Sequence, residues 1–158
     1  MSTIKTQQVT GRRTLDFKCI DDIRADVEQL AKAEPRALGN WSAGQVLMHL
    51  AIVMNNSIDG GPMAFGPVLR FLVRLLIKRR LLNRRMSPGF TLPKRVEGLI
   101  PPPTTWDQGV EAFRAALDRL KTETKRAPHP AIGRLTNEEW DRLHCRHSEL
   151  HLSFLVPA

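Results

Sequence analysis

The chain of 158 residues has the length of one ordinary domain, and with 42% hydrophobic residues it can close one core without a structural metal or disulfides. Its two cysteines, Cys19 and Cys145, are isolated, which excludes a disulfide framework and favours a reducing, cytoplasmic setting. The polar N-terminus argues against a secretory signal, and no apolar stretch reaches the length of a membrane span. We therefore expect a single domain over residues 1–158.

The formal net charge of +8 is concentrated in one part of the chain. Residues 60–96 contain nine Lys or Arg and no acidic residue, whereas the rest of the chain holds 15 basic and 16 acidic residues. In nucleic-acid-binding domains, basic residues usually follow a binding face across the fold. The distribution argues against dedicated nucleic-acid binding and marks a basic insert.

Apolar residues at helical spacing predict two helices after an extended or mobile N-terminal arm at residues 1–15. The first is expected at residues 20–34. The second begins after Ser42, because Ser42 and Gln45 have the spacing of a capping box, in which each side chain bonds the backbone N–H of the other.

A basic, amphipathic helix is expected at residues 65–85, within an insert and crossover that spans residues 60–103. Arg70, Arg74 and Lys78 recur every four residues on one face, opposite a wide apolar face. Because an apolar face of that width needs burial, we expect it to pack on the rest of the protein, with the basic face in water. The alternative is that the helix contacts anionic lipid, nucleic acid or an acidic partner.

Two further helices complete the prediction. One begins after Thr104 or Thr105 and ends near Arg126, and the other covers residues 137–154, after a capping box of Thr136 and Glu139. No strand signal competes with the helical patterns. We therefore predict an all-α fold, with four core helices and one long crossover that carries the inserted helix.

Three histidines on two of these helices suggest a metal site. His147 and His151 lie four residues apart, so both rings leave the same helix face one turn apart. His49 lies on the apolar stripe of the second helix, and the three rings can converge if the two helices are neighbours. They could then share a divalent transition metal at ~2.0–2.1 Å and leave a coordination position open, as catalytic sites do. The alternative is three ordinary core histidines, each with its own hydrogen-bond partner.

Other polar residues lie near the three histidines in the sequence or on the same helices. His144 is a candidate for a fourth ligand, for a group that supports the ligands or for the rim of the site. Asn56 and Ser57 follow His49 by about two turns and are candidate hydrogen-bond donors, unless they simply end the helix. Cys145 is interpreted as a small packing residue rather than a nucleophile.

Two runs resemble the DinB/YfiT-like superfamily, and in particular a poorly characterised bacterial branch of it, a domain of unknown function. These are NWSAGQVLMHL at residues 40–50 and WDRLHCRHSELHLSF at residues 140–154. The resemblance implies a four-helix bundle with up-down-down-up order, frequent homodimers, and a zinc or nickel site whose ligands would be His49, His147 and His151. Characterised relatives include mycothiol- and bacillithiol-dependent transferases and some metal-dependent hydrolases. The chain departs from this pattern in its basic insert and in His144.

Two functions follow as hypotheses. The first is a metal-dependent enzyme that acts on a small-molecule substrate, as a transferase with a low-molecular-weight thiol or as a hydrolase. No Asp or Glu is expected on the inward stripes near the three histidines, which favours thiol transfer. The second is a non-catalytic metal-binding or interaction module whose helix at residues 65–85 contacts an anionic partner, a membrane surface included.

Overall fold

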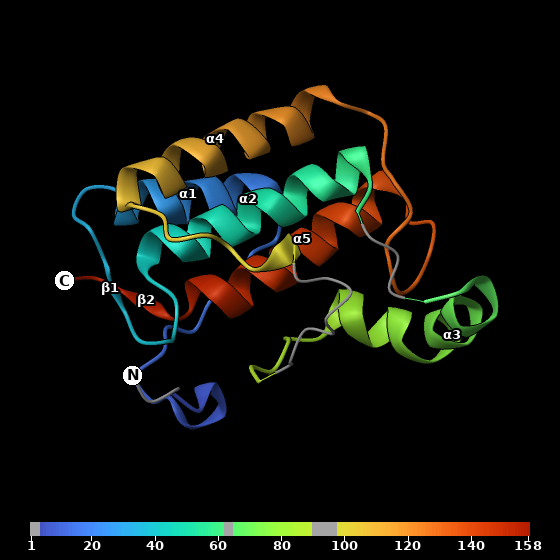
Figure 1. Ribbon diagram of the computed structural model, residues 1–158, viewed down its shortest axis with the longest axis horizontal. Helices are drawn as coiled ribbons and strands as arrows, with labels where there is room; N and C mark the ends of the chain where they lie inside the picture. The colour runs from blue at the N-terminus through green and yellow to red at the C-terminus, as the bar shows by residue number, and fades with distance from the viewer. Residues whose placement is uncertain (1–3, 62–64, 90–97) are drawn as a thin grey trace.

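The computed structural model describes residues 4–61, 65–89 and 98–158, and these residues are mostly helical (Figure 1). They form a short 3₁₀ turn, η1 (Thr6–Gln8), five α-helices and one small sheet. The helices are α1 (Ile20–Leu30), α2 (Ala43–Asp59), α3 (Pro67–Asn83), α4 (Trp106–Thr122) and α5 (Asn137–Leu152). The sheet pairs β1 (Arg36–Ala37) with β2 (Leu155–Val156) in antiparallel fashion.

The small sheet corrects the expectation that the chain contains no strand. Two of the helices are also shorter than predicted. α1 ends at Leu30 instead of residue 34, and α5 ends at Leu152 instead of residue 154. Pro35 disfavours helical geometry in the residue before it, so the chain leaves α1 early and enters β1. Strands of two residues are too short to produce a periodic pattern, which is why the sequence did not predict them.

The predicted helix starts are confirmed by the side-chain caps. Ser42 accepts a hydrogen bond from the Gln45 backbone N–H, and the Gln45 side chain accepts one from the Ser42 N–H. The same reciprocal pair joins Thr136 and Glu139 at the start of α5. Thr105, rather than Thr104, caps α4. Each cap satisfies backbone donors that the first turn of a helix would otherwise leave without partners.

α1, α2, α4 and α5 pack together around one apolar core, and we call these four helices the helical body (Figure 1). α2 and α4 approach most closely at two glycines: a Cβ on Gly44 would lie 2.2 Å from the Thr105 carbonyl oxygen, and one on Gly109 would lie 2.6 Å from the Gly44 oxygen. α5 contacts both α1 and α2. This contact places one face of α5 against the His49 face of α2.

α3 lies at one side of the helical body, where it contacts α5, and its orientation corrects our expectation (Figure 1). Two of its basic residues face the body: Arg74 donates to the carbonyl oxygens of Ile132 and Arg134, and Lys78 pairs with Glu139. Near its end, Leu82 is buried in a small cluster with Trp140 and Leu143 of α5. Most of its other large apolar side chains are exposed: Val68, Leu69, Phe71, Leu72, Leu75, Leu76 and Ile77.

The N-terminal segment from residue 4 onward is extended and attached to the end of α5. The Arg13 guanidinium makes two 2.7 Å hydrogen bonds to the Asp26 carboxylate and donates to the Leu155 oxygen at 2.6 Å. The Arg13 N–H donates to the Ser153 oxygen at 2.9 Å. These bonds bring neighbouring Arg12 to the C-terminal end of α5. None of the helices formed by the described residues is both long and apolar enough to span a membrane.

Candidate metal centre

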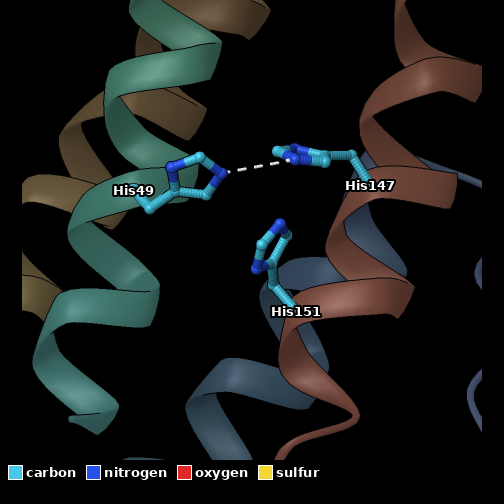
Figure 2. A group of neighbouring side chains, drawn as sticks. All are labelled: His49, His147 and His151. Atoms are coloured by element: carbon cyan, nitrogen blue, oxygen red, sulfur yellow. Dashed lines mark hydrogen bonds between the residues drawn. The ribbon is translucent and has the colours of Figure 1, made fainter. Parts of the chain in front are cut away.

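Three histidine side chains meet between α2 and α5. His49 extends from α2, and His147 and His151 extend from successive turns of α5 toward it (Figure 2). One ring nitrogen of each lies within 4.8 Å of those of the other two. The convergence predicted from the spacing is therefore confirmed, because α2 and α5 are neighbours at the height of these residues.

The closest pair of nitrogens has the separation that a shared ion requires. The distance from His49 Nε2 to His147 Nε2 is 3.3 Å. Two nitrogens that each lie ~2.0–2.1 Å from one tetrahedral ion are about 3.3–3.4 Å apart. A direct hydrogen bond between the rings is the alternative, but protein hydrogen bonds to nitrogen donors are usually ~2.7–3.2 Å long. The spacing fits two ligands of one ion better than it fits a donor and an acceptor.

The backbone sets the tautomer of His49. Its Nδ1 lies 2.7 Å from the carbonyl oxygen of Leu99, which can only accept, so Nδ1 carries the proton. Nε2 is then unprotonated and directs its lone pair toward the other two rings. A bond from the second ring nitrogen to a carbonyl is the arrangement that commonly orients histidine ligands of metals. His49 is thus both buried and held in the orientation that a ligand needs.

All three imidazoles are neutral at neutral pH. Burial lowers the pKa of His49 below its ordinary value, and for His151 burial, with smaller electrostatic contributions from His49 and Arg12, lowers the pKa to about 3. The pKa of His147 is also well below its usual value, first because of burial and then because of its histidine neighbours. Neutral rings keep a lone pair free for a cation. His147 and His151 retain some exposed surface, which leaves the cluster accessible from one side.

Trp41 and Arg12 surround the cluster and were not among the predicted site residues. The Trp41 ring stacks on His151 at 5.6 Å between centroids and lies 4.8 Å from the His49 ring. The Arg12 guanidinium lies over the Phe154 ring at 4.1 Å, donates to Ser153 Oγ at 2.7 Å, and acts electrostatically on His151. Trp41 precedes the Ser42 cap, which is a sequence signal for packing only. No sequence pattern indicated Arg12 as a site residue, because its position near the histidines depends on how the N-terminal segment folds.

His144 is not one of the three histidines that could hold a metal, and it bonds Ser57 instead. His144 is buried, and its Nε2 is 3.1 Å from Ser57 Oγ, whose own proton goes to the Met54 oxygen at 2.6 Å. The ring also stacks on Trp140 at 5.4 Å. The backbone oxygen of Asn56 accepts the hydrogen bond that ends α2. The His144–Ser57 pair thus forms a separate contact between α5 and α2.

The other reactive groups of α5 point elsewhere. Cys145 is buried in the main core, and burial raises the pKa of its thiol to about 12, which keeps it protonated. Glu149 is buried too; it accepts a hydrogen bond of 2.7 Å from the Phe17 N–H and forms an ion pair of 2.7 Å with Arg146. Neither group belongs to the cluster. Among the described residues, the group that can hold a metal consists of histidines alone.

These observations define a mostly helical protein in which two packed helices present three neutral histidines able to hold a metal ion. The family described as Protein of unknown function (DUF1569) matches residues 9–158, which is nearly the whole chain, and the protein belongs to this family. A search of curated proteins and a search of solved structures each found no match.

Proposed function

We propose that the protein is a metal-dependent enzyme in which His49, His147 and His151 bind one divalent transition metal, zinc or nickel. The observation that carries this proposal is the 3.3 Å separation of His49 Nε2 and His147 Nε2, together with the Nδ1 bond that directs the His49 lone pair into the cluster. Three imidazoles on two helices suit zinc and nickel better than magnesium or calcium, which prefer oxygen ligands.

We further propose that the helical body is a four-helix bundle of the DinB/YfiT-like type, with up-down-down-up order. Two features support this assignment: the packing of α1, α2, α4 and α5 around one core, and the long crossover from α2 to α4 that contains α3. The histidine positions agree with the motifs on which the resemblance rests. α3 is then an addition to the bundle rather than one of its four helices.

The surroundings of the cluster favour an anionic ligand. A divalent ion bound there would act as a Lewis acid and lower the pKa of a water or thiol bound to it. The three neutral imidazoles leave the charge of such an ion uncompensated, and Arg12 adds a positive charge close to His151. Trp41 stacks on His151 and would shield that side of a bound ligand from water. These residues would orient and stabilise a thiolate or another small anion.

Within this proposal, a thiol-dependent transferase is favoured over a hydrolase. Hydrolysis usually uses a carboxylate as general base, and none belongs to the cluster among the described residues. In thiol transfer the nucleophile is a thiolate, and a metal can produce it by lowering the pKa of the bound thiol. A cytoplasmic location, which we also propose from the two free cysteines, would provide a low-molecular-weight thiol as co-substrate and keep it reduced.

Metal analysis of untagged protein tests the site. We expect up to one zinc or nickel ion per chain, and loss of the ion in His49→Ala, His147→Ala and His151→Ala. His129→Ala is the matched control, because His129 lies outside the cluster and its Nδ1 accepts backbone hydrogen bonds from its own loop. Full retention of metal in His49→Ala would disprove a site shared between α2 and α5.

Cobalt substitution tests the chemistry. Titration of the cobalt protein with low-molecular-weight thiols should produce a thiolate-to-metal charge-transfer band, and Arg12→Ala should weaken thiol binding without removing the cobalt. Metal-dependent ester or amide cleavage with no thiol band would favour a hydrolase. A site that admits neither thiols nor any substrate would overturn the enzyme proposal and leave the second candidate, an interaction module, which rests on the exposed side chains of α3.

A further inference from the structure

α3 exposes an unusual amount of apolar surface. Its side chains include Leu76 at 81%, Val68 at 75% and Phe71 at 60% exposure, and four others exceed two fifths. Elsewhere in the described residues, the large hydrophobic side chains exposed to this degree are Ile4 and Ile100. Single exposed apolar residues are ordinary, but a cluster of seven on one helix indicates a surface that something covers.

The contacts of α3 with the helical body fix this orientation. The Lys78 ammonium is 2.5 Å from the Glu139 carboxylate, and Arg74 donates to two carbonyl oxygens of the loop before α5. Leu82 anchors the end of the helix in the cluster with Trp140 and Leu143. To bury its apolar residues on the body, α3 would have to rotate and give up these contacts. The apolar surface is therefore held outward.

The charge around this surface selects an anionic partner. Arg79 and Arg80 in the last turns of α3 and Arg84 at its C-terminal cap are exposed and lie close to Leu76. No acidic residue occurs between positions 60 and 96. A partner that covers the apolar part of α3 therefore also meets the exposed positive charges of Arg79, Arg80 and Arg84.

The distribution along and around α3 argues against a second copy of the chain. The exposed apolar residues occupy the first two thirds of the helix and the exposed arginines its end. An antiparallel pair of α3 helices would place apolar residues opposite arginines, and a parallel pair would bring the arginines together. Successive helical residues point ~100° apart, so Val68 and Phe71 share one face, whereas Leu69 and Ile77 are turned away from it, and the exposed apolar residues cover an arc wider than one stripe. A fluid acyl layer can cover all of these sides, whereas a flat protein surface covers one stripe.

We propose that α3 docks the protein on an anionic lipid bilayer. The apolar side chains of its first turns enter the acyl region, while Arg79, Arg80 and Arg84 bind lipid phosphates at the headgroup level. α3 lies in the interface and does not cross the membrane, because it is neither long nor apolar enough to do so. This proposal is independent of the metal centre, because none of the three histidines between α2 and α5 belongs to α3.

Co-sedimentation of the full-length protein with lipid vesicles tests the proposal. We expect binding to vesicles of equal parts phosphatidylcholine and phosphatidylglycerol, weak binding to phosphatidylcholine alone, and loss of binding in high salt. Leu72→Asp combined with Leu76→Asp should weaken binding to the anionic vesicles by about tenfold or more. Ile4→Asp is the control, since Ile4 is 44% exposed and Leu72 49%, and it should change binding less than about twofold.

A second pair of variants tests the role of charge. Arg79→Glu with Arg80→Glu should weaken binding by about tenfold or more, whereas Lys5→Glu with Lys125→Glu changes the net charge equally and should have a much smaller effect. The substituted side chains are exposed, so the variants should fold, which circular dichroism checks. Equal binding by the α3 variants and their controls would overturn the proposal. So would a dimer that dissociates in Leu72→Asp while no variant, nor the unaltered protein, binds vesicles.

Discussion

The helical body and α3 depart from ordinary burial in opposite directions. The body places imidazole rings among apolar side chains at the α2–α5 contact, whereas α3 places apolar side chains in water and turns Arg74 and Lys78 toward the body. Each departure costs free energy unless a partner compensates it, because buried polar groups need bonds and exposed apolar patches need cover. The two surfaces that we propose to be functional are therefore the places where the usual pattern is inverted.

The largest difference in stability between the helical body and α3 should appear when a glycine of each is replaced by alanine. Gly44→Ala would place a methyl group 2.2 Å from the Thr105 oxygen and force α2 and α4 apart, with a loss of about 3 kcal/mol or more in the free energy of unfolding. Gly66→Ala, at the start of α3, meets no atom within 4 Å and should cost less than about 1 kcal/mol. Denaturant unfolding measures both values, and similar losses would show that α2 and α4 can separate easily.

Metal binding should stabilise the body through its histidines. A metal that binds only the folded protein adds about 2.7 kcal/mol at a free concentration 100 times its dissociation constant. Thermal unfolding should therefore shift upward with added zinc in the unaltered protein and in His129→Ala. In His49→Ala the shift should disappear. An equal shift in His49→Ala would mean that zinc stabilises the fold at another place.

The attachment of α3 should depend on its buried end. Leu82 is 5% exposed and packs with Trp140 and Leu143, so Leu82→Ala should cost about 2–3 kcal/mol of local stability. Because the loss concerns mainly the α3–α5 contact, amide hydrogen exchange should accelerate across α3 and change little in α2 and α4. Uniform acceleration in all helices would indicate that α3 and the body unfold as one unit.

The smallest effect is expected on the exposed face of α3. Leu72→Asp should change the free energy of unfolding by no more than about 0.5 kcal/mol, since an exposed aspartate remains solvated. The matched change in the body, Leu47→Asp, buries an unpaired charge at a position with no exposed surface and should prevent stable folding. A large loss in Leu72→Asp would restore our original expectation that the apolar face packs on the body.

Most helices could be predicted because their signals are local. The Ser42–Gln45 and Thr136–Glu139 boxes begin helices wherever they occur, and both starts agree with the structure. The convergence of His147 and His151 follows from the geometry of one helix, and His49 needed only the further assumption that α2 and α5 are neighbours. The small sheet could not be predicted, since it joins segments from opposite ends of the chain.

The sequence by itself determined which residues form helices, which side of each helix is apolar, and that three histidines lie on inward stripes. These properties depend on neighbours within a few residues, where backbone geometry leaves little choice. Only the tertiary structure decided that Arg12 and Trp41 flank the histidines, that His144 bonds Ser57, and that α3 turns its apolar face outward. The physical reason is that the pattern of an amphipathic helix shows which of its sides is apolar, but not which surface that side contacts. The surface of the body near α3 offers Glu139 and backbone carbonyls, which bind cations better than leucines.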